Sequence, residues 1–317
     1  MVYAPVVLTT LNRIEHLKKC IGSLQKNTYA ERTDIYIALD YPPSQEYEEG
    51  YALVKEYLAS GIEGFNKVEI VYRDRNYGPI ENGLEIQKYV LSKYDRIICS
   101  EDDNVYAPCF LEYMNKALDQ YKDREDILAI YSYGPRVKRM PPNEVYIANY
   151  FSGYGCGYWR EKERQLTIEI NRKYIEELSC DKSKIKRLIK SNPESLCYLA
   201  SILLRKEPIY QTVDGTIQLI DTVRIVHAIA ENKFLLCSPI PMVKNLGYDG
   251  SGVHCEVDNA KFSDVHVCEN TINPVTIVDK PVVEQLDYSL KFKRIVPFVS
   301  AVVRIWVWRI IAKRRSF

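Results

Sequence analysis

The chain has 317 residues, of which 46% are hydrophobic and 27% are charged. This composition can form a substantial core, and it excludes disordered, collagen-like and low-complexity classes. Lys and Arg number 43 against 42 for Asp and Glu, so the formal net charge is only +1. That total conceals an asymmetry, because residues 286–317 carry +7 and the preceding 285 residues carry −6. Such an asymmetry indicates a membrane or nucleic-acid contact limited to the basic end.

Short apolar runs alternate with amphipathic stretches through the first part of the chain. Strands are expected at residues 5–11, 34–40, 68–72 and 96–100, and helices at 14–24, 44–59, 80–91 and 107–121. This alternation predicts an α/β fold with a mostly parallel sheet and helices on both faces. Ligands of such sheets bind beyond the carboxyl ends of the strands, so the residues that follow each strand are the first candidates for a site.

No internal repeat and no linker rich in Gly, Pro or Ser divides the chain. We therefore expect one continuous unit over residues 1–285, in which residues 127–285 complete a site begun by residues 1–126. Residues 286–317 are expected to form a separate, basic amphipathic tail.

Three consecutive acids, Glu101, Asp102 and Asp103, follow the fourth expected strand. Carboxylates this close repel one another, so holding them at the mouth of a sheet is costly unless a cation or a hydroxylated ligand compensates. A hard ion such as Mg2+ or Mn2+ takes one or two carboxylates, and a substrate diphosphate supplies further oxygens. The alternative is an exposed acidic turn before the helix that begins near Pro108.

Several segments, in their order and spacing, resemble the nucleotide-sugar-dependent glycosyltransferases of the GT-A fold. The matching segments are PVVLTTLNR (5–13), IALD (37–40), NYGPIENG (76–83), CSEDD (99–103), SGYGCGYW (152–159), IDTVR (220–224) and KNLGYDGSGVHC (244–255). The resemblance is closest to family-two-like transferases and to N-acetylglucosaminyltransferase I, whose metal motif is also Glu-Asp-Asp. It implies a Rossmann-like GT-A sheet with a nucleotide-binding half at 1–126, an acceptor-binding half at 127–285, and Mn2+ or Mg2+ as cofactor.

The resemblance also implies a role for each matching position. Asp103 would be the direct metal ligand, Asp102 would contact the ribose, and Glu101 would lie near the transferred sugar. Asp40 would hydrogen-bond the uracil ring or its equivalent. The other residues expected in the donor site are Thr9, Asn12, Arg13, Asn76, Gly78, Gly155, Trp159, Asp249 and His254.

Two glycine-rich segments are candidates for a pocket wall and a lid. Residues 154–159 combine small residues, which let a ligand approach the backbone, with aromatic faces on which sugars stack. Trp159 is equally suited to the core. Residues 247–252 could order over the diphosphate and exclude water, although an ordinary surface loop would have the same composition.

An acceptor hydroxyl must lose its proton as it attacks the anomeric carbon, and a carboxylate within reach can take that proton. The candidate base is Asp221, at the start of an expected helix and in a position where similar transferases carry an Asp. Those transferases have Trp before it, whereas this chain has Ile220. Asp214 is the fallback. The alternative for Asp221 is a helix-terminal acid paired with Arg224 or Arg205.

The tail from Ile295 to Ile311 is apolar but contains Arg304, Arg309 and Pro297. It is short and costly as a spanning helix, and it reads better as a helix lying in an anionic membrane interface. The alternative is a helix docked on the body or on another copy. The basic residues alternate with an apolar run that suits acyl chains, so nucleic acid is not expected as a partner.

The sequence therefore predicts an inverting, divalent-metal-dependent glycosyltransferase that moves a hexose or N-acetylhexosamine from a UDP-linked donor to a glycan or lipid-linked saccharide. We expect it to act in surface-polysaccharide assembly, peripherally on the cytoplasmic face of the cell membrane. A sugar nucleotidyltransferase is disfavoured because the first strand lacks a glycine-rich loop to wrap a triphosphate. A non-catalytic nucleotide-sugar or carbohydrate-binding protein is the other alternative.

Overall fold

The computed structural model describes residues 2–134, 137–139, 141–149, 155–166, 172–191, 193–204, 220–251, 265–284 and 292–315. The strands in these ranges are β1 (Val6–Thr10), β2 (Asp34–Leu39), β3 (Lys67–Tyr72), β4 (Arg96–Glu101), β5 (Asn104–Tyr106), β6 (Ile127–Tyr131), β7 (Tyr146–Ala148), β8 (Cys156–Trp159), β9 (Phe234–Cys237), β10 (Val243–Asn245) and β11 (Val282–Val283). The helices are α1 (Ile14–Gln25), α2 (Glu48–Ala59), α3 (Gly78–Leu91), α4 (Phe110–Gln120), α5 (Arg160–Leu166), α6 (Arg172–Cys180), α7 (Lys182–Ser191), α8 (Pro193–Leu204), α9 (Ile220–Ala230) and α10 (Phe292–Arg315). Short 3-10 turns cover Ala30–Arg32, Gln45–Tyr47 and Gly247–Asp249.

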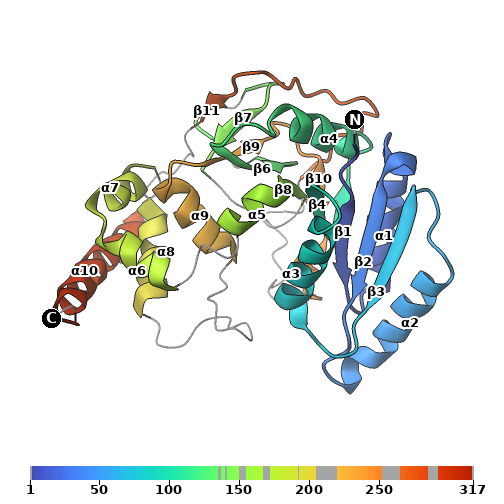
Figure 1. Cartoon of the computed structure of the whole chain (residues 1–317), viewed down its shortest axis with the longest axis horizontal. Coiled ribbons are helices and arrows are strands. Elements are labelled where there is room, and N and C mark those ends of the chain that lie inside the picture. The colour runs from blue at the N-terminus through green and yellow to red at the C-terminus, as the bar shows by residue number, and fades with distance from the viewer. Residues whose placement is uncertain are drawn as a thin grey trace.

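A nine-stranded sheet forms the centre of the molecule, in the order β11-β7-β9-β6-β8-β4-β1-β2-β3 (Figure 1). Strands β1 to β4 are mutually parallel where they pair, as the alternating pattern predicted. Strand β8 runs antiparallel to both β4 and β6, and β9 is parallel to β6. The expected α/β class with a mostly parallel sheet is confirmed, and the sheet runs through both halves of the chain.

Each face of the sheet has its own hydrophobic core, because successive residues of a strand point to opposite faces. In β1, Val6 and Leu8 pack with α1, α2 and α4, whereas Val7 packs with α3 on the other side. The second core continues through α6 to α9. Helices therefore cover both faces of the sheet, and almost all residues of the central strands are buried.

The helices expected in the first part of the chain are present, with ends that differ by a few residues. Helix α4 begins at Phe110, after Pro108, whereas the sequence pattern predicts a start at Ala107. The α2 region opens with a 3-10 turn at Gln45–Tyr47 before α2 itself begins.

Two further arrangements position parts of the site and the tail. Strands β5 and β10 pair as an antiparallel ribbon that joins the segment after the acidic residues to the second half of the chain. Helix α10 packs on α8 and α6 through buried Ala301 and Ile305, so the described part of the tail docks on the body with one face. None of the helices in the described part of the chain is long and apolar enough to cross a membrane.

Candidate active site

The ends of the parallel strands meet at one edge of the sheet, as the strand order requires. The backbone N–H of Asp40, which follows β2, donates to the carbonyl of Thr10 at the end of β1 with an N···O distance of 3.0 Å. On the other side of β1, Thr9 pairs in register with Glu101 of β4. Thr9 is partly exposed, and so is Asn12, which lies just beyond the end of β1. This edge therefore brings together the residues after β1, β2 and β4.

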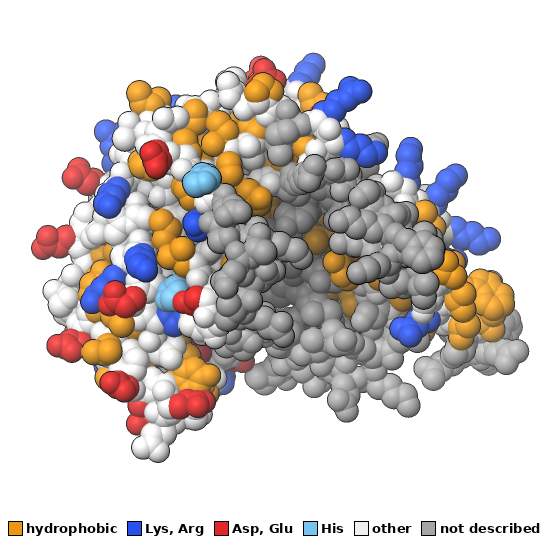
Figure 2. All heavy atoms as spheres, turned by 180° about the vertical axis from the view of Figure 1, so that it is seen from behind, with side chains coloured by type: hydrophobic (Ala, Val, Ile, Leu, Met, Phe, Trp, Pro, Cys, Tyr) orange, Lys and Arg blue, Asp and Glu red, His pale blue; other side chains and the backbone are white. Residues whose placement is uncertain are grey.

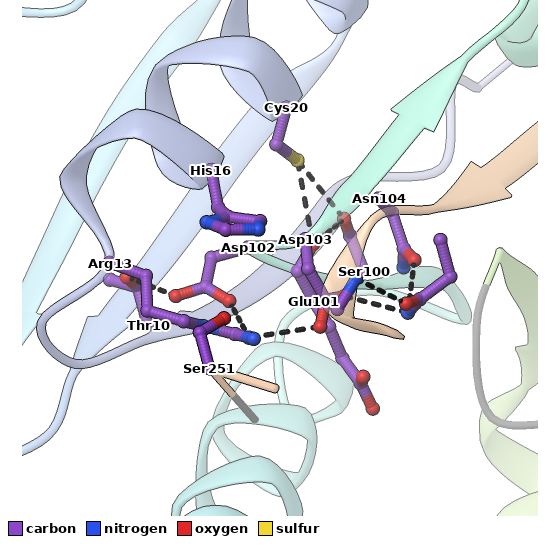
Figure 3. A network of polar contacts seen from close by, with 12 residues as sticks. Thr10, Arg13, His16, Cys20, Ser100, Glu101, Asp102, Asp103, Asn104 and Ser251 are labelled. Atoms are coloured by element: carbon purple, nitrogen blue, oxygen red, sulfur yellow. Dashed lines mark hydrogen bonds and ion pairs between the residues drawn. The ribbon is translucent and has the colours of Figure 1, made fainter. Parts of the chain in front are cut away.

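Asp102 and Asp103 form a buried carboxylate pair at this edge, with residue exposures of 3% and 6%. The Thr10 hydroxyl donates to Oδ2 of Asp102 at 2.9 Å. Nη2 of Arg13 donates to Oδ2 of Asp103 at 3.0 Å and also to Oδ1 of Asp102 (Figure 3). One guanidinium thus bridges both carboxyl groups, so a single cationic side chain faces two acids.

The electrostatics of this group follow from its burial. Burial raises the pKa of Asp102 above its usual value, and the charge of Asp103 raises it further, while Arg13 and Thr10 oppose the shift. Burial disfavours the charge of Arg13, yet the two carboxylates together raise the pKa of the guanidinium. Its Nη1 atom is buried without a hydrogen-bond partner in the described part of the chain. The group can therefore offer carboxylate oxygens to a cation and donate further hydrogen bonds from Nη1 of Arg13.

Glu101 differs from its two neighbours although the three acids are consecutive. Its side chain is exposed, and Figure 3 shows it pointing away from Arg13. Glu101 is the last residue of β4, whereas Asp102 and Asp103 form the turn that follows. The acidic triplet is thus a buried pair beside a separate exposed carboxylate.

A segment from the second half of the chain forms hydrogen bonds with Asp103. Nδ2 of Asn245 donates to Oδ1 of Asp103 at 2.8 Å, and the N–H of Leu246 donates to the Asp103 carbonyl at 2.7 Å. Oδ1 of Asn245 in turn accepts the N–H of Gly247 at 2.7 Å. No individual role is expected from the sequence for Thr10 or Asn245. Both are in segments that carry the GT-A resemblance, which was the available signal.

Asp249, expected to contact the donor, pairs with α1 in this structure. Its Oδ2 lies 3.1 Å from Nε2 of His16, and its Oδ1 accepts hydrogen bonds from the N–H and hydroxyl of Ser251 at 2.9 and 2.6 Å. The described part of the expected lid, residues 247–251, therefore lies against α1 and Asp103. His254 lies outside the described residues.

Asp40 holds the turn that follows β3. Its Oδ1 accepts the N–H groups of Tyr41 and Tyr77, both at 2.9 Å, and its Oδ2 lies 3.4 Å from Nδ2 of Asn76. Burial raises the pKa of Asp40, although the N–H groups of Tyr77, Tyr41 and Gly78 lower it. Gly78 adopts φ of +73°, which suits glycine. The structure thus brings Asp40, Asn76 and Gly78 together, and the chain's own backbone uses much of the carboxylate.

Trp159 lies in the core, which corrects the expectation of a pocket wall. It is 2% exposed, and its indole N–H donates to the carbonyl of Leu118 at 3.0 Å. Because β8 is antiparallel to β4, Trp159 pairs with Arg96 at the far end of β4. Gly155, just before β8, lies at the end of β4 that leads to the carboxylate pair. Strand direction therefore separates two residues that the sequence places close together.

A family model for glycosyl transferase family 2 matches residues 6–181, which is just over half of the chain. The chain belongs to glycosyl transferase family 2. The matched region contains β1 to β4, the carboxylate pair and Gly155. The α/β architecture agrees with the GT-A fold.

The solved structures that the chain matches share little sequence identity with it. They include S. aureus TarS (12% identity, TM-score 0.34, 53% of this chain and 29% of that chain), the mannosyltransferase PcManGT from Pyrobaculum calidifontis in complex with GDP-Man and Mn2+ (10%, 0.41, 72% and 69%) and mouse xyloside xylosyltransferase 1 (10%, 0.35, 56% and 74%). The chain spans less than half the length of the TarS structures it matches, 29% of one and 49% of the other. No curated protein sequence matches the chain significantly.

The backbone of Asp221, at the second position of α9, lies toward the same edge of this family 2 sheet as the carboxylate pair. Strand β8 is antiparallel to both β4 and β6, so β6 and its parallel neighbour β9 run in the direction of β4. Helix α9 leads into β9 and runs back along the sheet, which directs its first turn to the carboxyl edge (Figure 1). The side chain of Asp221 is not described, and Asp214 lies outside the described residues.

Arg224, considered as an ion-pair partner of Asp221, is buried on α9. Its Nε donates to the carbonyl of Leu166 at 2.6 Å, which ties α9 to the end of α5. Arg205, the other candidate partner, lies outside the described residues.

The carboxylate pair is suited to a divalent cation that arrives with a substrate. In the described part of the chain, no group of three or more His, Cys, Asp or Glu side chains could hold a metal. Mg2+ typically takes one or two protein carboxylates, and substrate phosphates supply other ligands. Asp102 and Asp103 would provide these carboxylate oxygens. The residues therefore fit a cation shared between protein and donor.

Gly247 lies so close to Asp103 that the position admits no side chain. An ideal Cβ at this position would lie 2.3 Å from Oδ2 of Asp103. Gly247→Ala should therefore displace the Asn245–Gly247 segment, lower the free energy of unfolding by about 1–3 kcal/mol and weaken binding of a nucleotide sugar. Chemical denaturation and donor titration would measure the two effects.

Gly22→Ala is the matched control for this substitution. Nothing lies within 4 Å of an ideal Cβ at Gly22, which is inside α1. Removing a helical glycine should raise stability by about 0.5–1 kcal/mol without changing donor affinity. Equal effects of the two substitutions would contradict the proposed close approach at Gly247.

Proposed function

We propose that the protein is an inverting glycosyltransferase that uses Mn2+ or Mg2+ to transfer a hexose or N-acetylhexosamine from a UDP-linked donor to a glycan or lipid-linked saccharide. The observation that carries this proposal is the buried Asp102–Asp103 pair, which Arg13 bridges at the carboxyl edge of the sheet. Buried carboxylates that exceed their cationic partners favour binding of another cation.

Different residues around the carboxylate pair would bind different parts of the donor. Asp103, oriented by Asn245, and Asp102, oriented by Thr10, would hold the cation and the ribose side of the nucleotide. Arg13 has one unpartnered Nη1 donor in the described structure, which would serve a diphosphate oxygen. A bound divalent cation would neutralise charge on the departing diphosphate.

The transfer step requires a base on the acceptor side. The acceptor oxygen would form a bond to the anomeric carbon while the bond from that carbon to the diphosphate oxygen breaks, which inverts the anomeric centre. The acceptor proton would pass to the carboxylate of Asp221, and the diphosphate would leave with the electron pair. The placement of the first turn of α9 at the carboxyl edge supports this role.

A thermal-shift panel of nucleotide sugars, each with and without Mn2+, tests the donor site. A donor present at one hundred times its Kd should raise the free energy of unfolding by about 2.7 kcal/mol. This corresponds to a rise in melting temperature of about 5 °C. We expect the shift for a UDP-sugar and expect it to require Mn2+. Absence of stabilisation by every nucleotide sugar would contradict the donor site, and a metal-independent shift would contradict the cation.

The two alternative functions predict different results in this panel. A sugar nucleotidyltransferase should be stabilised by a nucleoside triphosphate and a sugar phosphate, although TLNR at residues 10–13 contains no glycine to wrap a triphosphate. A non-catalytic nucleotide-sugar-binding protein should show the donor shift and no transfer.

The proposal includes a peripheral location on the cytoplasmic face of the membrane, where lipid-linked acceptors of surface-polysaccharide assembly would be reached. The exposed apolar side chains of α10 and its lack of acidic residues support this location. Helix α10 would lie along the membrane surface, with Ala301 and Ile305 holding it to the body.

A further inference from the structure

Helix α10 has an apolar face that the protein leaves uncovered. Ala301 and Ile305 point into the body, and the opposite side of the helix is exposed, with Trp306 at 61%. The exposed apolar side chains, here called the α10 face, are Val299, Val302, Val303, Trp306, Val307 and Ile310. Of the exposed side chains described between residues 299 and 310, only Arg304 is charged. A continuous apolar face of this kind marks a contact with a membrane or a protein.

Helix α7 has a basic stripe on its outer side. Lys182, Lys186, Ile189 and Lys190 are exposed and recur at helical spacing, so they line one face, here called the α7 stripe. Leu188 points inward and is fully buried. Neither α7 nor α10 contains an acidic residue. The charge of the stripe is thus not compensated within either helix.

One hydrogen bond joins α10 to the segment that precedes α7. Nε of Arg309, near the last described turn of the α10 face, donates to the carbonyl of Ser179 at 2.6 Å. Ser179 is in the last turn of α6, and α7 begins three residues later at Lys182. Figure 2 shows hydrophobic side chains gathered at the end of the molecule where α10 lies, with Lys and Arg side chains projecting beside them.

We propose that the α7 stripe and the α10 face together form one docking surface for an anionic lipid bilayer. The inference deepens the peripheral membrane location proposed above and adds α7, which lies far from the tail in sequence. The apolar side chains would enter the boundary between headgroups and acyl chains, and the lysines would contact anionic headgroups.

Charge complementarity favours a bilayer over a second copy of this chain. A two-fold interface places the same patch on both subunits, so it would bring two α7 stripes toward each other. Like charges brought together in this way are unfavourable. An anionic bilayer instead supplies negative charge beside an apolar layer, which matches lysines beside Trp306 and the α10 valines.

Cosedimentation of the full chain with vesicles tests the surface. Two vesicle compositions are needed, phosphatidylcholine alone and phosphatidylcholine mixed with phosphatidylglycerol. We expect binding to the mixed vesicles only, and the triple substitution Lys182→Gln, Lys186→Gln and Lys190→Gln should lower the partition coefficient about a hundredfold. A matched control replaces the exposed lysines Lys26, Lys55 and Lys122 with Gln, which should leave binding unchanged.

A second variant tests the contribution of the α10 face. Trp306→Ser should weaken binding to the mixed vesicles, and the emission of Trp306 should shift to shorter wavelength when the unchanged protein binds. Equal loss of binding in the two lysine triples would overturn the role of the α7 stripe. Dimerisation that depends on Trp306, without vesicle binding, would overturn the bilayer as the partner.

Donor binding measured without vesicles separates this inference from the proposed function. The α7 triple variant and Trp306→Ser should retain the melting temperature and the donor-induced shift of the unchanged protein, because their substituted side chains lie on α7 and α10, outside the site. Vesicle binding without a donor shift would leave the docking surface supported and the donor site contradicted.

Discussion

Asp103→Asn should reduce sugar transfer at least about a hundredfold, since loss of groups that merely support a metal ligand already costs 10–100-fold. Asn has nearly the same shape and keeps one oxygen to accept the hydrogen bond from Nδ2 of Asn245, so the segment at residues 245–247 should stay in place. What is lost is one of the two charges at the site. Transfer assays at increasing Mn2+ would measure the change, and we expect higher Mn2+ to restore part of the activity.

The control for this substitution is Asp123→Asn, which removes a carboxylate from an exposed turn after α4. It should leave transfer, donor affinity and the response to Mn2+ unchanged. If Asp103→Asn retained full transfer at every Mn2+ concentration, Asp103 could not be a metal ligand. The buried carboxylate pair would then serve only to orient Arg13.

Asp221→Asn should leave donor binding intact and lower the rate of transfer by about 10²–10⁴-fold, which is the usual contribution of a general base. The reason is that Asn cannot accept the proton of the acceptor hydroxyl, whereas Asp102, Asp103 and Arg13, which would hold the donor, are unchanged. Donor titration by calorimetry and single-turnover transfer assays would separate the two effects.

Asp214→Asn is the comparison for this experiment. If Asp221 is the base, the change at Asp214 should have little effect on the single-turnover rate. If the loss appears with Asp214→Asn and not with Asp221→Asn, the base is the fallback residue. Unchanged transfer in both variants would remove both carboxylates from the role.

The elements of the first half could be predicted because their signals are local. Apolar runs such as Val6–Thr10 and Asp34–Leu39 are bounded by polar residues, and the helices between them repeat apolar residues at helical spacing. Parallel strands with intervening helices place their carboxyl ends at one edge, which is why the acids after β4 and Asp40 after β2 were candidates. The structure brings both to that edge.

The errors concern residues whose neighbours are distant in sequence. Asn245 binds Asp103 across 142 residues, and no local pattern marks that contact. Trp159 is in a segment with the composition of a pocket wall, yet the antiparallel direction of β8 carries it to the far end of β4. The end of β4 also separates exposed Glu101 from the buried Asp102–Asp103 pair, a difference that three consecutive acids do not show in the sequence.

The sequence by itself determined the α/β class, the strand ends from which the site is built and the charge asymmetry between body and tail. These depend on composition and on the spacing of residues along a short stretch. Only the tertiary structure decided that Arg13 bridges Asp102 and Asp103, that Asn245 holds Asp103 from the second half, and that α10 docks with one face and exposes the other. Such features depend on strand direction and on which helix faces pack together, and both are set by contacts between segments far apart in the chain. The net charge of +1 illustrates the difference, because the sequence alone shows that the tail is basic, whereas only the folded chain brings Arg309 of the tail to Ser179 of α6.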